Sequence, residues 1–120
     1  MGWNFSNDRS VYLQIMDKIK EMIISGQYKA GDKLPAVREF AEEAQVNPNT
    51  MQKALSELER EELIFTQRTS GRFVTCDEEK IQQLKEGLAS DVIRDFIEKM
   101  TGLGFDSDEI VSKIKNYGGK

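Results

Sequence analysis

The sequence of 120 residues contains no histidine and a single cysteine, Cys76. Histidine and clustered cysteines are the usual zinc ligands, and histidine is the commonest acid–base catalyst. Because the sequence also has no glycine-rich phosphate loop, we expect neither an enzyme nor a bound metal or cofactor. One cysteine excludes a disulfide within the chain and fits a reducing compartment. Cys76 has no cationic neighbour in the sequence, so we expect an inert thiol rather than a redox sensor.

Long apolar runs are also missing. No stretch approaches the roughly 18 apolar residues of a membrane span. The start Met-Gly-Trp-Asn-Phe lacks the basic and then apolar pattern of a secretory signal. We therefore expect a cytoplasmic protein with no membrane partner. Its length corresponds to one domain, or to one small domain with an appendage.

An excess of positive charge is the third missing feature. The sequence has 17 Lys and Arg residues against 21 Asp and Glu residues, a net charge of −4. Residues 1–75 carry ten basic and eleven acidic side chains, and residues 76–120 carry seven and ten. Many nucleic-acid binders are basic overall. A nucleic-acid binder with this balance needs its charges sorted in space, so that a local positive face steers the ligand.

Residues 47–59 carry a clear helix signature. Asn47 can accept from free backbone N–H groups at a helix start, and Pro48 suits the first helical position. One face of this helix is apolar, and the opposite face carries amides, a hydroxyl and a cation without a carboxylate. The apolar face consists of Met51, Leu55 and Leu58, and the polar face of Asn49, Gln52, Lys53 and Ser56. Such a polar face suits the DNA major groove, where amides pair with adenine edges and a cation meets phosphate.

The neighbouring segments predict the rest of a DNA-binding domain. Amphipathic helices are expected over residues 11–25 and 36–44, and three residues separate the second of them from the helix that follows Asn47. The β-prone runs 63–66 and 72–75 flank a turn that contains Gly71. Three helices followed by a hairpin indicate a winged helix-turn-helix DNA-binding domain over residues 1–75.

Residues 76–120 predict a tail of two helices. Apolar residues recur at three- and four-residue steps from Ile81 to Met100, which indicates a helix of about 23 residues that ends near Gly102 and Gly104. An acidic capping box at Asp106 then starts a fifth helix. The expected fold class is therefore mainly α with a small β-hairpin (α+β), in which a helical dimerisation segment follows the DNA-binding domain.

The apolar stripe of this tail needs to be covered. It either forms a core within the chain or pairs with a second copy of the chain. Because two helices from 45 residues cannot enclose much surface alone, we expect a homodimer. The residues expected at the dimer interface are Ile81, Leu84, Leu88, Val92, Phe96, Met100, Ile110 and Ile114.

Several motifs resemble the N-terminal region of GntR-type transcription regulators. They are Gly31-Asp32-Lys33-Leu34-Pro35, Val37-Arg38-Glu39-Phe40-Ala41, Val46-Asn47-Pro48-Asn49-Thr50 and Gly71-Arg72-Phe73-Val74. The resemblance extends over about residues 9–75, and the Asn-Pro-Asn-Thr run together with the short tail resembles the YtrA subfamily. It implies a dimeric repressor, often of nearby transporter genes, that binds an operator of inverted half-sites.

Two features depart from the family pattern. Glu62 stands where the pattern usually has glycine, so we expect a different entry into the first strand of the wing. Pro48 and Gln52 occupy positions where many GntR proteins carry arginine in the recognition helix. Guanine reading by arginine is therefore not carried over, and the operator sequence is left open.

Nine residues are expected to contact DNA. The resemblance implies contacts at Arg38, at residues 47–53 and at Gly71 in the wing. The alternative for Arg38 is an ion pair, and the alternative for the amides of residues 49 and 52 is simple solvation. The full set is Arg38, Asn47, Asn49, Thr50, Gln52, Lys53, Arg68, Gly71 and Arg72.

Four of these residues have a further alternative role. Asn47 is expected mainly to cap the helix. The Thr50 hydroxyl either meets phosphate or returns to the helix backbone. Lys53 either meets phosphate or pairs with Glu57 four residues on. Arg72 either enters the minor groove or is a charge at the strand edge.

The expected function is sequence-specific DNA binding by a homodimer that represses transcription by blocking polymerase. Two recognition helices would enter successive major grooves of a double-stranded operator. The tail is too short for an effector domain of its own. Either a small-molecule effector of unknown identity binds between the tail and the DNA-binding domain or at the dimer seam, or the protein has no effector. The alternative function is a winged-helix protein-interaction module without operator recognition, which the acidic balance favours.

Overall fold

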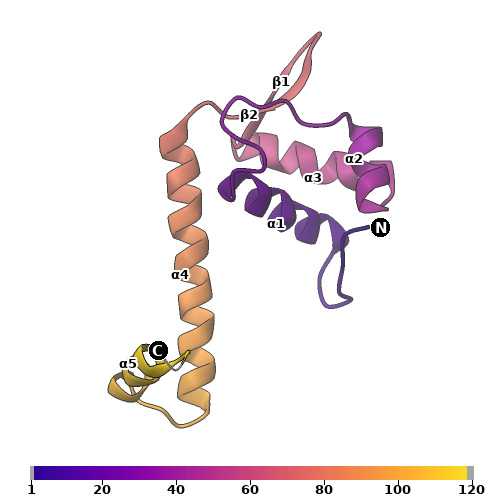
Figure 1. The fold of residues 1–120 in the computed structure, drawn as a ribbon. Helices are drawn as coiled ribbons and strands as arrows, with labels where there is room; N and C mark the ends of the chain where they lie inside the picture. The colour runs from indigo at the N-terminus through magenta and orange to yellow at the C-terminus, as the bar shows by residue number, and fades with distance from the viewer. Residues whose placement is uncertain (1, 119–120) are drawn as a thin grey trace. The chain divides into compact units, whose positions relative to one another are not determined.

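The computed structural model describes residues 2–118, within which it has five helices and one two-stranded sheet (Figure 1). The chain forms two compact units, one up to Leu84 and one from Lys85 onward. We call the first unit the reader and the second the tail. The elements are α1 (Val11–Ile24), α2 (Val37–Ala44), α3 (Pro48–Arg60), β1 (Ile64–Gln67), β2 (Gly71–Val74), α4 (Glu78–Gly102) and α5 (Ser107–Asn116). The expected class, mainly α with a small β-hairpin, is confirmed.

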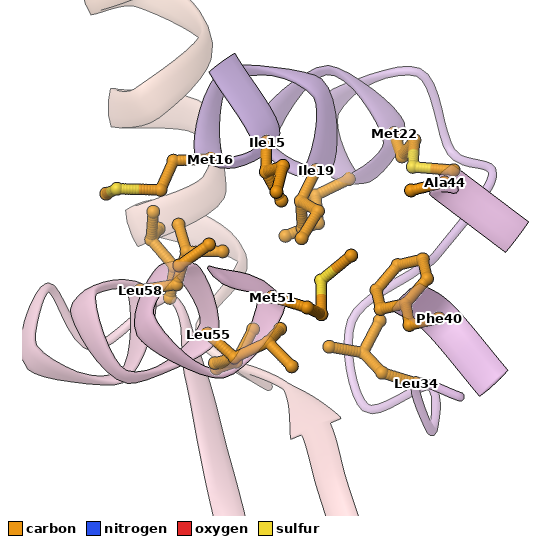
Figure 2. Close-up of a cluster of buried hydrophobic side chains, with 14 of the residues drawn as sticks. Ile15, Met16, Ile19, Met22, Leu34, Phe40, Ala44, Met51, Leu55 and Leu58 are labelled. Carbon is orange, nitrogen blue, oxygen red and sulfur yellow. The ribbon is translucent and has the colours of Figure 1, made fainter. Parts of the chain in front are cut away.

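One apolar core joins the elements of the reader (Figure 2). Ile15 and Ile19 of α1 are fully buried, as are Met51 and Leu55 of α3, because the apolar residues of each helix recur at helical spacing and form one face. Figure 2 shows the two faces turned toward each other, with Phe40 of α2 beside them. Since its apolar face is covered in this way, α3 presents its polar face outward.

The connection between α2 and α3 forms the helix-turn-helix. Gln45 directly follows α2 in the left-handed conformation, with φ of 60°, and so reverses the chain direction. Asn47 then caps α3, because its Oδ1 accepts a hydrogen bond of 2.7 Å from the backbone N–H of Asn49. Pro48 is the first residue of the helix. The predicted start of α3 is confirmed, whereas α2 begins one residue later than predicted, with Ala36 as its N-cap.

The antiparallel hairpin of β1 and β2 is the wing. Its register pairs Thr66 with Arg72 and Gln67 with Gly71, so that residues 68–70 form the turn. Gly71 has φ of 109°, a conformation that side chains other than glycine rarely adopt. Both strands lie one residue closer to the turn than predicted. Ile64 and Val74, which pair at the base of the hairpin, are buried in the core, and the turn end of the wing extends away from the helices (Figure 1).

The segment that precedes α1 packs against the helix-turn-helix without regular secondary structure. The backbone N–H of Trp3 donates to the carbonyl oxygen of Ala44 at 3.3 Å, at the C-terminal end of α2. Its ring lies edge-on to Phe40, with the ring centroids 5.5 Å apart. A Cβ atom at Gly2 would lie 2.8 Å from the same carbonyl oxygen, so the backbone approaches α2 more closely than a larger residue allows.

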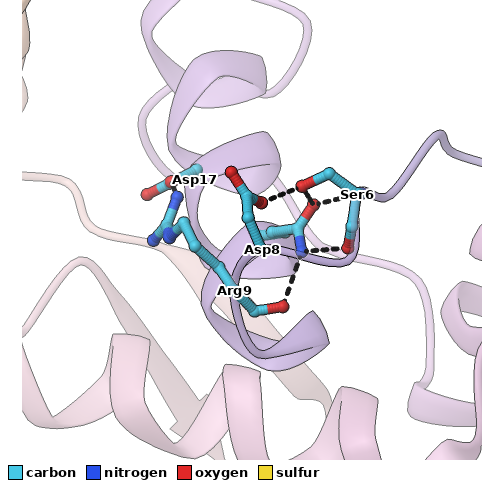
Figure 3. Close-up of polar contacts among 5 residues, drawn as sticks. Ser6, Asp8, Arg9 and Asp17 are labelled. Carbon is cyan, nitrogen blue, oxygen red and sulfur yellow. Dashed lines mark hydrogen bonds and ion pairs between the residues drawn. The ribbon is translucent and has the colours of Figure 1, made fainter.

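Polar contacts fix the same segment to α1 (Figure 3). The side-chain amide of Gln14 donates to the backbone carbonyls of Ser6 at 3.0 Å and Arg9 at 2.9 Å. The Arg9 guanidinium pairs with Asp17 at 2.7 Å, and this hydrogen bond and charge raise the pKa of Arg9. The hydroxyl of Ser6 also donates to Asp8. These contacts order residues 6–9 on the surface of α1.

The tail contains most of α4, together with α5. α4 has 25 residues against about 23 predicted, and it ends at Gly102. The capping box of α5 is confirmed: Asp106 Oδ1 accepts from the Glu109 N–H at 2.9 Å, and Glu109 Oε1 accepts from the Asp106 N–H at 3.0 Å. Across residues 2–118, no helix combines the length and apolar character that a membrane crossing requires.

Candidate nucleic-acid interface

The outer face of α3 presents the two predicted amide side chains to solvent. Asn49 and Gln52 are both exposed, whereas Met51 and Leu55 on the other face are buried. The Gln52 amide donates to the Ser56 hydroxyl one turn further along at 3.1 Å. Hydrogen bonds at such an exposed site exchange with water, so a base edge can replace them at small cost. The surface is therefore accessible to a duplex and carries the donors and acceptors that direct readout uses.

The first turn of α3 holds the next two predicted residues. The Asn47 side chain is exposed and occupied as the helix cap, which was its expected main role. Thr50 is half-buried, and its backbone N–H donates to the carbonyl of Asn47 at 3.0 Å. The backbone N–H groups of Asn49 and Thr50 are thus already engaged, and it is the helix dipole that favours an anion at this end. A phosphate could therefore approach this end of α3.

Lys53 lies on the face that carries the amides, but its neighbour is not the one considered from the sequence. Its Nζ is 4.0 Å from the ring centroid of Tyr12 in α1, a cation–π contact. Glu57 pairs instead with Arg60, at 2.7 Å. The ammonium is thus held over a neutral ring and keeps its positive charge uncompensated by Glu57. This arrangement suits contact with a phosphate.

Three further predicted residues surround this helix. Arg38 is exposed on the first turn of α2, and Arg68 is exposed in the turn of the wing. Gly71 opens β2, and a Cβ atom there would lie 3.2 Å from Cε of Lys33. The reader thus carries cations on α2, on α3 and on the wing, although its total charge is not basic.

Arg72 has a partner inside the reader. Its Nε lies 3.2 Å from Oε1 of Glu59 in α3, and its side chain is 18% exposed. The hydroxyl of Thr66 donates to the other oxygen of the same carboxylate. Neither role considered from the sequence, in the minor groove or as a charge at the strand edge, included this ion pair. A compensated and largely covered guanidinium attracts phosphate weakly.

Sequence reasoning missed Lys33, Tyr12 and Glu59. Lys33 forms an isolated antiparallel bridge with Phe73, which brings it beside the wing. It lines an open groove of about 810 Å³ between the start of α2 and the wing. Tyr28 lines the same groove, and burial together with the charge of Glu43 raises the pKa of its phenol. A cation in a turn-rich connector carries no periodic signal that would have drawn attention to it.

The tail residues predicted at a dimer interface fall into three groups by exposure. Ile81 and Leu84 are partly buried against the core of the reader, and Ile110 is buried within the tail. Leu88 and Met100 are half-buried. Val92, Phe96 and Ile114 are exposed in the single chain, at 66%, 39% and 56%. The exposed group extends to residues that the prediction did not include, namely Ile93, Ile97, Leu103, Val111 and Tyr117.

A helix-turn-helix followed by a two-stranded wing, with an amide-bearing second helix facing solvent, defines the winged helix-turn-helix class of DNA-binding proteins. The model of the gntR family of bacterial regulatory proteins matches residues 11–74. The chain therefore belongs to the GntR family, whose members are DNA-binding transcription regulators and not enzymes.

Individual relatives agree with this assignment over 69–98% of the chain. The HTH-type transcriptional regulator YhcF of Bacillus subtilis is 37% identical over 117 residues, which cover 98% of this chain and 97% of YhcF. The transcriptional repressor YtrA of the same species is 43% identical over 89 residues, 69% of this chain and 68% of YtrA. A GntR family transcriptional regulator from Listeria monocytogenes has a similar structure, with a TM-score of 0.87 and 40% identity. That comparison covers 92% of this chain and 97% of the Listeria chain. The resemblance to GntR regulators and to YtrA is confirmed.

Proposed function

We propose that the protein is a sequence-specific repressor that binds an operator of inverted half-sites as a homodimer in the cytoplasm. The observation that carries this proposal is the exposed amide face of α3, behind which a fully buried apolar face fixes the helix. A rigid helix with outward hydrogen-bonding side chains can meet base edges at a defined register. The homology to regulators and repressors supports the same function.

The proposed contacts divide into base reading and phosphate binding. Asn49 and Gln52 read base edges in the major groove, where an amide can bond adenine at two positions. Lys53 and Arg38 bind phosphates on either side of that groove and fix the register. Arg68, in the exposed turn of the wing, reaches the adjacent minor groove.

Charge sorting reconciles the acidic total with DNA binding. The acidic residues nearest the reading face are already paired: Glu57 with Arg60 and Glu59 with Arg72. Their charges are therefore offset, whereas the ammonium of Lys53 lies over an aromatic ring. A local positive surface of this kind steers DNA even when the whole chain is acidic.

The exposed apolar surface of the tail supports the homodimer. Val92, Phe96 and Ile114 are apolar side chains exposed on the tail, and exposed apolar patches mark protein–protein contacts. A second copy would cover this surface and bring two readers to one operator. Recognition helices of such dimers lie about 34–36 Å apart, one turn of DNA. Occupation of a promoter would then block polymerase, and nearby transporter genes are the targets that the YtrA resemblance implies.

Operator binding is tested by fluorescence anisotropy with DNA from upstream of the chain's own gene, at two salt concentrations. We expect saturable and salt-sensitive binding, which Gln52→Ala weakens by about 1–3 kcal/mol. Lys53→Ala should weaken operator and random DNA alike. The control is Gln27→Ala, which removes an exposed amide from the connector before α2. If Gln52→Ala binds like this control, α3 does not read the operator and the protein-interaction alternative gains support.

Dimerisation is tested separately by sedimentation of the full-length protein. Val92→Glu introduces a charge into the exposed apolar surface, and we expect it to produce monomers. Glu98→Gln is the control, because it also changes the charge by one unit, at an exposed position about 100° or more around α4 from Val92, Ile93 and Ile97. A dimer that survives Val92→Glu as well as it survives Glu98→Gln would mean that this surface is not the interface.

A small-molecule effector would regulate this function. If one exists, a binding site at the tail or dimer seam would let it change the spacing of the two readers. Sedimentation and operator titration in the presence of the solutes handled by neighbouring transporter genes test this idea. A solute that changes operator affinity would identify the effector, and none with an effect would favour a repressor without one.

A further inference from the structure

The wing and the recognition helix are joined by one carboxylate. Thr66 of β1 and Arg72 of β2 are directly opposite each other in the hairpin. The Thr66 hydroxyl donates to one oxygen of Glu59, and Arg72 Nε donates to the other oxygen at 3.2 Å. Glu59 lies near the C-terminal end of α3. A single side chain thus connects three elements, and it engages both strands at the same rung of the hairpin.

This arrangement differs from the other ion pair on the same helix. The side chain of Glu59 is 29% exposed and that of Glu57 is 32% exposed, so the two carboxylates meet similar amounts of solvent. Glu57 pairs with Arg60 three residues along α3 and therefore connects the helix only to itself. Glu59 pairs with a residue thirteen positions away, on a different element. The contacts of Glu59 can therefore determine the position of the wing, and those of Glu57 cannot.

We propose that Glu59 is a positioning residue for operator recognition, which sets the angle of the wing relative to α3 before DNA is bound. This inference rests on the proposed operator-binding function and adds a residue to it. Arg68 in the wing turn and Gln52 in α3 must meet neighbouring grooves of one duplex at the same time. A wing held in advance at the correct angle loses less conformational entropy on binding than a mobile one.

The proposal also assigns Arg72 a structural role. A guanidinium that bonds to Glu59 in the free protein can contact DNA only after that bond breaks. In the arrangement proposed here the bond persists in the complex, and Arg68 is the arginine of the wing that meets the duplex. The opposite arrangement, in which DNA takes Arg72 from Glu59, predicts the opposite effect when Glu59 is replaced.

Whether replacement of Glu59 tightens or weakens operator binding distinguishes an electrostatic effect from a positioning effect. Removing an acidic side chain near the interface reduces repulsion of phosphate, which alone would tighten DNA binding. Loss of positioning should weaken operator binding instead. Glu57→Ala removes an equally exposed carboxylate from the same helix, so it measures the electrostatic effect by itself. The difference between Glu59→Ala and Glu57→Ala then isolates the contribution of position.

The experiment measures operator and random-sequence dissociation constants by anisotropy for both variants. Relative to Glu57→Ala, we expect Glu59→Ala to weaken operator binding about tenfold and to leave random-sequence binding unchanged. Hydrogen exchange of residues 66–72 should accelerate in Glu59→Ala and stay as in the parent in Glu57→Ala. Equal operator affinities for the two variants, or tighter operator binding by Glu59→Ala, would overturn the proposal.

Two milder variants keep the test decisive if Glu59→Ala does not fold. Thr66→Val removes one donor from an exposed strand position and preserves side-chain shape, and Glu59→Gln keeps one acceptor oxygen. Each should reduce operator affinity by less than Glu59→Ala, and their combination should be less than additive because both act on one network. Full additivity would contradict a shared role.

Failure of this inference can be separated from failure of operator binding itself. If Gln52→Ala weakens operator binding and Glu59→Ala does not, α3 reads DNA and the wing needs no carboxylate to position it. If neither variant changes binding, the proposed operator-binding function is wrong, and the positioning role of Glu59 that rests on it is wrong as well.

Discussion

The reader and the tail are both made of amphipathic elements, but only one of them covers its own apolar face. In the reader, residues such as Ile19, Phe40 and Leu55 are fully buried by other elements of the same chain. In the tail, Ile110 is buried, while Val92 and Ile114 are more than half exposed. Burial of apolar surface is the main favourable contribution to folding. The reader can therefore be stable by itself, whereas in the proposed homodimer a second copy covers the apolar surface of the tail.

The largest expected effect tests this difference directly. Leu55→Ala should lower the free energy of unfolding by about 2–5 kcal/mol, because it leaves a cavity in a closed core. This loss should not depend on protein concentration. Val92→Ala should cost less than about 0.5 kcal/mol in dilute protein and should destabilise only at concentrations where dimers form. Urea denaturation at two protein concentrations measures both.

A large loss for Val92→Ala in dilute protein would contradict the comparison, since it would mean that the tail buries Val92 within one chain. Met100→Ala is a useful intermediate, because Met100 is half-buried. Its cost should lie between those of the other two variants.

Local signals in the sequence were sufficient to predict most of the fold. The start of α3 follows from Asn47 and Pro48, which act through contacts with immediate neighbours in the chain. The apolar faces follow from spacing, and the capping box of α5 follows from Asp106 and Glu109. These features depend on residues within four positions of each other. Such short-range patterns are what periodicity and capping rules describe.

The contacts that were not predicted join residues that are distant in the sequence. Lys53 meets Tyr12, and Arg72 meets Glu59, where the sequence suggested nearer partners or DNA. No short-range rule indicates that Trp3 would reach the end of α2. Such pairings arise from packing of the whole unit, which brings residues of different elements together. They determine which of the candidate DNA-binding residues are already engaged within the chain.

Trp3 provides the next test, because it extends the closed core of the reader beyond the helices. Trp3→Ala should reduce the stability of the reader by about 2 kcal/mol, less than the loss of a fully buried aromatic residue, since Trp3 is half-buried. Hydrogen exchange at the backbone N–H of residue 3 should accelerate, because that N–H donates to the Ala44 carbonyl and the ring no longer holds the segment in place. Asn4→Ala, at the exposed neighbouring position, is the control.

Circular dichroism during urea denaturation is suitable for this measurement, since Trp3 is the only tryptophan of the chain and its removal abolishes that fluorescence signal. Equal stability of Trp3→Ala and Asn4→Ala would show that the N-terminal segment lies on the reader without contributing to its core.

A smaller effect compares the helix caps of the two units. Asn47→Ala and Asp106→Ala should each cost about 1 kcal/mol, because each removes a side-chain acceptor from free backbone N–H groups. The loss at Asn47 should appear in the global unfolding of the reader. The loss at Asp106 should appear as faster hydrogen exchange confined to α5, because so little of the tail is buried in one chain. Ser107→Ala, next to the cap, should leave this exchange unchanged.

If Asp106→Ala instead lowers the stability of the reader, the two units unfold together and the comparison between them fails. Repeating the exchange measurement at high protein concentration sharpens the test. A dimer that covers the tail should slow exchange throughout α5 in the parent protein, and it should reduce the difference between the parent and the variant.

An expected effect as small as the loss of a helix cap lies at the point where α3 leads into the wing, and it concerns backbone conformation rather than burial. Glu62 has φ of 64°, a left-handed conformation that costs a residue with a Cβ atom about 1 kcal/mol relative to glycine. This conformation explains why glycine suits the position in the family pattern. The Glu62 carboxylate also pairs with Lys80 at 3.2 Å, but its side chain is largely exposed, so this pair contributes little.

Glu62→Gly and Glu62→Ala both remove the ion pair, and only glycine relieves the backbone. We therefore expect Glu62→Gly to be more stable than Glu62→Ala by about 1 kcal/mol in urea denaturation. Equal stabilities would mean that the left-handed conformation at residue 62 costs a residue with a Cβ atom no measurable free energy.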